Sequence, residues 1–178
     1  MKVYPQLDKL RKIQAAGIQI DDILHNTQEQ MRLRSCLVEQ QVDLIEWLSH
    51  ETELLKNQLK IKHSCKLEFH PGSVSYPVTV YPLLLGVLLE QVILTVIDSS
   101  EPGGSIPLNC SIRKENGQCY VSLQALFSQS VGLEIKRTIE MVNRAFSLYC
   151  EAHQIQVKPM PYSVSPDRVE FLISGGYE

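Results

Sequence analysis

The sequence predicts an α+β protein in which an N-terminal helical block is followed by an α/β sandwich. The first observation is a block from residue 7 to residue 62 that contains no proline and is rich in the helix formers leucine, glutamine, glutamate and lysine. The second is an apolar, helix-length stretch that begins near Leu83. The third is an Asn116-Gly117 hairpin signal followed by an amphipathic helix. Helix, hairpin and helix in this order are typical of α/β sandwiches.

The helical block carries apolar residues at a seven-residue spacing. One series is almost entirely apolar and a companion series is polar in its middle: Leu24, Met31, Val38, Ile45, Thr52, Leu59 and Ile20, Thr27, Arg34, Gln41, Leu48, Leu55. This pattern suits a helix packed along a broad face better than an uninterrupted two-stranded coiled coil. We therefore expect residues 1–40 to form a helical dimerisation segment, with a break either at Gly17 or in the polar run of residues 32–36.

Local patterns predict the later elements in chain order. Residues 64–69 alternate as a strand, and residues 70–77 are a loop. Pro82 suits the first turn of a helix, where its missing N–H costs nothing, and residues 102–104 form a turn after that helix. The remaining predictions are antiparallel strands at residues 110–113 and 120–123, a helix at residues 133–153, and two more strands at residues 155–158 and 169–174.

Length and composition are those of an ordinary globular chain. At 178 residues the protein is one domain, or one domain with a helical extension, and a chain of this length can bury ~70% of its unfolded surface. Hydrophobic residues make up 44% of the chain, charged residues make up 21%, and the formal net charge is −3. Such a charge supplies no basic field, so we expect no nucleic-acid partner.

The cysteines and the apolar segments indicate a cytoplasmic protein. Five cysteines at wide spacings form neither a CxxC pair nor a cluster with zinc-finger spacing, so we interpret them as reduced thiols. Cys110 and Cys119 could nevertheless face each other across the predicted hairpin. The N-terminus has no apolar signal-peptide segment. An apolar run over residues 78–97 is about as long as a membrane span, but Pro82 and Glu90 interrupt it, and we expect a buried helix and no membrane association.

The stretch LLLGVLLEQVILTVIDSSEPGG, residues 83–104, resembles the N-box helix of the GHKL ATPases, the superfamily that includes the histidine kinases. In that family an apolar helix carries two asparagines four residues apart and leads through a glycine-rich turn into a strand. The resemblance extends over residues 42–173, because VDLIEWLSHETELLKNQLKIKHSCKLEF is similar to the first helix and strand, and SIPLNCSIRKENGQCYVSLQ is similar to the next hairpin. It implies that residues 41–178 form a GHKL-like α/β sandwich domain.

The residues that bind nucleotide in this family are replaced. Val87 and Gln91 stand at the two asparagine positions. Valine cannot coordinate a metal, and the glutamine amide lies about one methylene too far out for octahedral Mg²⁺. Gln124 and Ala125 stand where the family has the aspartate of its DxGxG motif. The ATP lid shrinks to the run LFSQS, and the glycine motif after it keeps only Gly132-Leu133. We therefore expect a degenerate relative that has lost ATP, with no cofactor and no bound metal.

Two histidines meet the local requirements of a phosphate acceptor, which are an exposed ring on a rigid helix beside an acidic or amide neighbour. His25 is followed by Asn26 within the helical block. His50 is followed by Glu51 in LSHETELL, which resembles the start of a kinase phosphoacceptor box. We take His25 as the candidate acceptor and His50 as the alternative, because the resemblance places His50 inside the first sandwich helix. The competing interpretation of each is a solvated surface histidine.

Three functional hypotheses follow. The favoured one is a homodimeric, non-ATP-binding signalling protein that resembles a degenerate histidine kinase and acts in a two-component-type pathway as a phosphotransfer or adaptor protein. Its partner would be a response-regulator receiver domain, and its enzymatic activity, if any, that of a histidine phosphotransferase. The alternative is a pseudo-ATPase interaction module, anti-sigma-like or scaffolding, without phosphotransfer. The third is a working ATPase with an unusual site. No GxSxG elbow, P-loop or HExxH motif points to another enzyme class.

Overall fold

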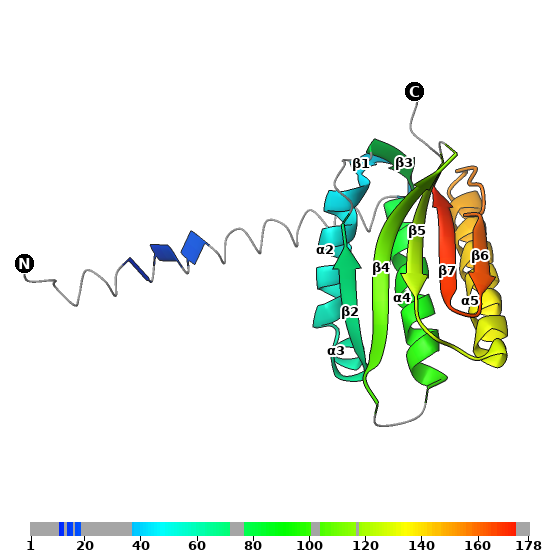
Figure 1. Ribbon diagram of the computed structural model, residues 1–178. Helices are drawn as coiled ribbons and strands as arrows, with labels where there is room; N and C mark the ends of the chain where they lie inside the picture. The colour runs from blue at the N-terminus through cyan, green and yellow to red at the C-terminus, as the bar shows by residue number, and fades with distance from the viewer. Residues whose placement is uncertain are drawn as a thin grey trace, which may run out of the picture.

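The computed structural model describes residues 11–12, 14–15, 17–18, 37–71, 77–100, 104–116 and 118–173. Figure 1 shows the chain with its elements labelled. In chain order they are β1 (Gln40–Asp43), α2 (Leu44–Asn57), α3 (Leu59–Ser64), β2 (Cys65–His70), β3 (Pro77–Val80), α4 (Pro82–Asp98), β4 (Ile106–Glu115), β5 (Gln118–Gln124), α5 (Gln129–Ala152), β6 (Tyr162–Ser165) and β7 (Arg168–Ile173).

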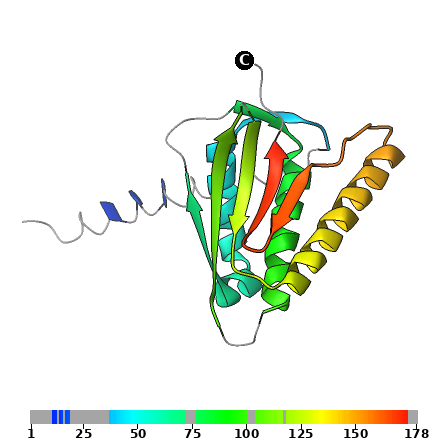
Figure 2. The same ribbon diagram turned by 45° about the vertical axis from the view of Figure 1, so that its right-hand side comes forward.

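The described elements form two layers. A five-stranded sheet has the order β2-β4-β5-β7-β6, in which β2 runs parallel to β4 and the other neighbours are antiparallel. Helices α2, α4 and α5 cover one face of this sheet (Figures 1 and 2), and none of the described elements covers the other. The short strands β1 and β3 pair separately as an antiparallel ribbon.

The core lies between the sheet and the helices. Strand residues at alternate positions point into it, such as Leu108, Val121 and Phe171, all buried. Helix α4 is buried on most of its sides, and Leu88 and Ile93 are among its fully buried residues. A helix that is apolar nearly all round suits a central place in a layer, and that is where α4 lies, between α2 and α5 (Figure 2).

Several sequence predictions are confirmed. Pro82 opens α4 within its first turn, as its missing N–H allows. The hairpin of β4 and β5 turns at Asn116, whose φ of 52° lies in the left-handed region that asparagine tolerates. The predicted strand at residues 64–69 is β2, the predicted helix at residues 133–153 lies within α5 except for its last residue, and β7 covers most of the strand predicted at residues 169–174.

Cys110 and Cys119, which could have faced each other across the hairpin, do not. In the β4–β5 register Cys110 is opposite Leu123, and Cys119 is opposite Lys114. Both cysteines are buried free thiols, because the hairpin places them four residues apart along the ladder rather than across from each other.

The helical block is interrupted by a strand that the sequence analysis did not predict. Residues 40–43 are extended as β1, and Val42 is opposite Val78 of β3. Asp43 then caps α2, because its carboxylate accepts hydrogen bonds from the N–H groups of Ile45 at 2.9 Å and Glu46 at 3.2 Å. Gly17 has helical backbone, so the turn considered there is not observed. The other considered break, at residues 32–36, lies outside the described residues.

The strand predicted at residues 155–158 is also wrong. These residues form an irregular segment, and the sheet edge beside β7 is taken by β6 instead. Ile155 and Val157 still pack on the core, half-buried, which accounts for their apolar alternation. The buried side chain of Asn143 on α5 holds the following residues, since its Oδ1 accepts from Met160 N at 2.9 Å and its Nδ2 donates to Met160 O at 3.3 Å.

Candidate functional site

The positions aligned with the nucleotide-binding asparagines lie on α4, and one side of this helix faces α5. Val87 and Gln91 are both half-buried. Gln91 lies one turn before Thr95, so the two share a side of α4. The Thr95 hydroxyl donates to Gln91 O at 2.8 Å and lies 3.2 Å from the hydroxyl of Thr138 on α5. One turn further on, Ser99 Oγ donates to Glu134 Oε2 at 3.0 Å. Helix α5 therefore packs along the side of α4 that carries Gln91 and Thr95.

The segment after β5 is short and attached to the sheet. Ala125 N donates to Asp167 O at 3.1 Å, and Phe127 N donates to Pro166 O at 3.3 Å, so these residues are bound to the β6–β7 turn. Ser128 then caps α5, its hydroxyl accepting from Val131 N at 3.4 Å. Where the resemblance expects an aspartate, the segment supplies the buried methyl group of Ala125.

A cavity of about 330 Å³ lies between the start of α5 and the β6–β7 turn. Its lining residues are Phe127, Ser128, Gln129, Gly132, Leu133, Lys136, Val164, Ser165 and Pro166. Gly132 is not needed for a close approach here, since an added Cβ would lie 3.7 Å from the Phe127 ring and 3.8 Å from a Val164 methyl, which are ordinary contact distances. The volume is at the lower end of ligand pockets, and among the described residues that line the cavity Lys136 alone is charged.

Of the two candidate acceptor histidines, the structure describes only His50. His25 lies outside the described residues. His50 is half-buried on α2. Its neighbour Glu51 is 0% exposed, and its carboxylate lies against Gly86 of α4. The Glu51 side chain thus points into the helix layer. It is not on the protein surface, where it would have to lie to assist phosphorylation of the His50 ring.

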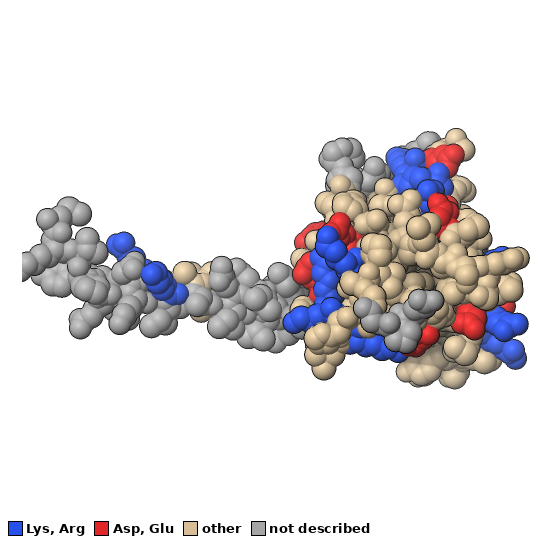
Figure 3. Space-filling view, turned by 60° about the horizontal axis from the view of Figure 1, so that its bottom comes forward, with Lys and Arg blue, Asp and Glu red and all other residues tan. Residues whose placement is uncertain are grey.

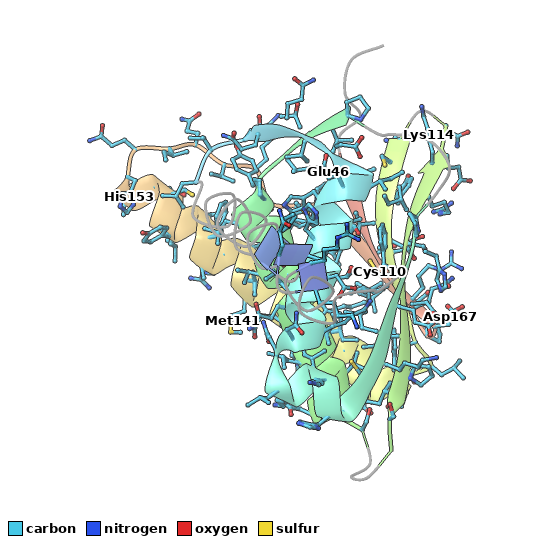
Figure 4. The ribbon with its side chains drawn as sticks, turned by 90° about the vertical axis from the view of Figure 1, so that its left-hand side faces the viewer. Glu46, Cys110, Lys114, Met141, His153 and Asp167 are labelled. Atoms are coloured by element: carbon cyan, nitrogen blue, oxygen red, sulfur yellow. The ribbon has the colours of Figure 1, made fainter. Side chains whose placement is uncertain are left out.

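The remaining described histidines lie apart from one another. His70 is on the uncovered sheet face, with its Nε2 3.3 Å from Asn109 Oδ1 and 3.7 Å from Glu68 Oε2. His153 directly follows the last residue of α5, and its Nδ1 lies 2.8 Å from Tyr149 O. Figure 4 labels His153 at this end of the helix. His63 is exposed on α3. Across residues 37–71, 77–100, 104–116 and 118–173, no group of three histidines, cysteines or acidic residues is placed to hold a metal ion.

The uncovered sheet face carries a polar cluster that the sequence analysis missed. Arg113 on β4 reaches across β5 to Glu170 on β7, with Nε and one terminal nitrogen each 3.2 Å from a carboxylate oxygen. The Arg113 guanidinium also lies 4.7 Å from the centre of the Tyr120 ring. Ser122, the cross-strand neighbour of Glu170, is 2% exposed. The sequence feature that could have predicted this cluster is the alternation of polar and apolar residues along β4.

The carboxylates beside Arg113 raise its pKa, first through hydrogen bonds to Glu170 and Glu115. On β2, a hydrogen bond from Lys66 lowers the pKa of Glu68. The Lys66–Glu68 pair is exposed, and salt bridges of this kind contribute little. The Glu170 side chain is only 13% exposed, so its pair with Arg113 is partly shielded from solvent. We interpret the Arg113 cluster as side-chain pairing that joins β4, β5 and β7 on this face of the sheet.

The surface charges are mixed. Figure 3 shows basic and acidic side chains interspersed around one face of the molecule, with no single large basic area on it. Within the described part of the chain, no helix combines the length and apolar character needed to cross a membrane.

Comparisons with known proteins find resemblance in structure but not in sequence. No protein family and no curated protein matches the sequence. A histidine kinase from Burkholderia phymatum STM815 superposes with a TM-score of 0.51 at 9% identity, covering 97% of this chain and 87% of that one. The Acinetobacter baumannii histidine kinase AdeS gives 0.48 at 14% identity, covering 99% and 88%. Full-length ShkA, solved in complex with AMPPNP, gives 0.49 at 10% identity, covering 100% of this chain and 41% of its own. At such identities the likeness is one of fold, and the chain has a histidine-kinase-like α+β fold.

Proposed function

We propose that this chain is a signalling or regulatory protein of two-component type that does not bind ATP and acts as a phosphotransfer or adaptor protein. The observation that carries the proposal is the packing of α5 along the Gln91 and Thr95 side of α4. The histidine-kinase-like fold supports the signalling class, and the replaced nucleotide-binding residues support the loss of ATP.

Three features act together against a nucleotide site. Val87 has no ligand atom, and Mg²⁺ demands near-ideal octahedral geometry that the longer side chain of Gln91 does not suit. Ala125 has no carboxylate to recognise adenine. The short connection from β5 to α5 is hydrogen-bonded to the β6–β7 turn, which leaves little chain to form a lid. Loss of all three contacts is what distinguishes this proposal from that of an unusual ATPase.

The partner that we propose is a receiver domain, which docks on a homodimer formed through residues 1–40 in the cytoplasm. His25 is the proposed phosphate acceptor, with His50 as the alternative. His50 is the weaker candidate because it is half-buried and because the carboxylate of its neighbour Glu51 faces α4. We therefore favour His25 as the acceptor.

The test is phosphate transfer from a receiver domain. The full chain is incubated with a receiver domain phosphorylated on its aspartate, and the label transferred to the chain is measured together with its acid lability. We expect acid-labile label on the parent chain and on His50→Gln, and none on His25→Gln. Label that survives His25→Gln but disappears in His50→Gln would reverse the assignment.

The second candidate function is a pseudo-ATPase interaction module of the anti-sigma or scaffold kind, without phosphotransfer. The observation that favours this module is that the Glu51 side chain points inward. As a result, no described histidine combines an exposed ring with an adjacent acidic side chain on the surface of a helix. Receiver binding without any transferred label would select this module over the phosphotransfer protein.

A further inference from the structure

Helix α5 exposes a line of apolar side chains on a side that faces away from the core. Ile135, Ile139 and Phe146 are buried against the core. On the other side Met141 is 62% exposed and Leu148 is 57% exposed. Exposed alanines at positions 145 and 152 continue the line, so that large and small residues alternate at spacings of four, three and four. Figure 4 shows Met141 on the side of α5 that faces away from the sheet.

This line borders a hollow of about 520 Å³ on the helix surface. The residues around it are Arg137, Glu140, Met141, Arg144, Ala145 and Leu148. They are neighbours three and four apart on one helix, which is the arrangement that receives a side chain from a facing helix in knobs-into-holes packing. The small Ala145 side chain permits close approach of two helix backbones at this point.

The charges beside the line are opposite in sign and unpaired. Arg137 and Glu151 are both exposed, and among the described residues neither side chain takes part in an ion pair. They are separated by about 21 Å along the helix, too far to meet within one copy. The midpoint of Arg137 and Glu151 falls at position 144, and that of Met141 and Leu148 falls between positions 144 and 145.

We propose that α5 pairs antiparallel with α5 of a second copy of this chain, about a two-fold axis beside Ala145. Because both midpoints fall within one residue of position 145, the two-fold places Met141 against Leu148 of the second copy and Arg137 against Glu151 of the second copy, each contact occurring twice. Arg144, which lies at the axis, has Glu140 one turn earlier on its own helix to offset its charge. Burial of the exposed apolar line accounts for its presence on the surface.

This contact is separate from the dimerisation proposed for residues 1–40 and does not depend on phosphotransfer. A chain that uses both contacts associates beyond the dimer. The α5 contribution is therefore measured as a change in the association constant of the full chain by sedimentation velocity across a concentration series.

Charge reversal tests the pairing. We expect Arg137→Glu and Glu151→Arg each to weaken the α5-dependent association about tenfold, and the double variant to restore it to within about threefold of the parent, because the ion pairs reform with exchanged signs. Lys136→Glu is the matched control, with the same charge change on another side of α5, and should leave association unchanged. Single reversals without effect, or a double reversal no stronger than the singles, would overturn the proposal.

Cysteine cross-linking supplies a readout independent of charge. Ala145→Cys should form a disulfide-linked dimer of the full chain under an added mild oxidant, since the two sulfur atoms meet near the axis. Lys136→Cys and the parent chain, run in parallel, should form it much more slowly. Equal rates for Ala145→Cys and Lys136→Cys, with unchanged circular dichroism, would contradict a two-fold at this position.

Discussion

The carboxylate of Glu51 on α2 lies against the backbone of Gly86 on α4. A Cβ added at Gly86 would lie 3.0 Å from Glu51 Oε1, and Glu51 is fully buried. The Glu51 side chain can reach the α4 backbone at this point because position 86 has no side chain. A fully buried carboxylate is rare in a small domain, and the space that it occupies depends on this glycine.

We expect Gly86→Ala to destabilise the protein. Alanine gains up to about 1 kcal/mol in helix propensity. The added methyl group, however, meets a buried carboxylate that cannot swing into solvent, and overpacking of this kind costs about 1–3 kcal/mol. Urea unfolding followed by circular dichroism should show a lower midpoint. An unchanged or raised midpoint would mean that Glu51 moves aside easily.

Gly132→Ala is the matched opposite case. The added methyl group meets Phe127 and Val164 at ordinary contact distances. Only the propensity gain remains, and we expect the free energy of unfolding to rise by about 0.5–1 kcal/mol. The same urea titration measures it. A clear loss of stability would show that this glycine has a role that its surroundings do not reveal.

Asn143→Ala should release the segment before β6. The variant loses both hydrogen bonds to Met160 and leaves a buried backbone N–H unsatisfied, which costs about 1–3 kcal/mol. We expect faster amide hydrogen exchange over residues 155–161 and little change in β4 and β5. Lys136→Ala, an exposed substitution elsewhere on α5, is the control. Equal protection of the segment in both variants would show that the Asn143 bonds do not hold it.

Burial raises the pKa of the Cys110 thiol to about 12. Cys110 should therefore resist iodoacetamide in the folded protein at pH 8.5 and react once the chain is unfolded in urea, as measured by mass spectrometry of the peptide. The pKa of the Cys110 thiol in the folded state lies above its ordinary value of 9.0. The contribution of this thiol to the free energy of unfolding is therefore complete below pH 9 and falls as the pH rises from 9 towards 12. A folded protein that labels readily at Cys110 would contradict this.

ATP with Mg²⁺ at millimolar concentration should leave the unfolding temperature unchanged. A nucleotide present at a hundredfold excess over its Kd would add ~2.7 kcal/mol to the folded state, which a thermal melt resolves easily. Mg²⁺ alone and ADP serve as controls. A rise of several degrees that requires ATP would revive the hypothesis of an unusual ATPase.

Local chemistry explains what could be predicted from the sequence. Some sequence features determine the structure of their immediate neighbours. Pro82 and the apolar residues 83–98 predict a helix, the Asn116 turn predicts a hairpin, and the structure has both. The residue types at positions 87, 91 and 125 are likewise properties of the chain alone, so the loss of nucleotide ligands could be proposed without coordinates.

Tertiary packing decided the rest, because it depends on contacts between residues far apart in the chain. Residues 155–158 alternate between apolar and polar side chains as a strand does, but the strand that pairs with β7 is Tyr162–Ser165. The hydrogen bonds of Asn143 to Met160 and the register of β7 determine where the chain joins the sheet. The pairing of Val42 with Val78 makes a strand within a helix-rich stretch. Likewise, the packing of the helices determines that the Glu51 side chain is buried and that Met141 is exposed. The spacing of apolar residues along a helix does not specify which neighbouring element covers each side of that helix.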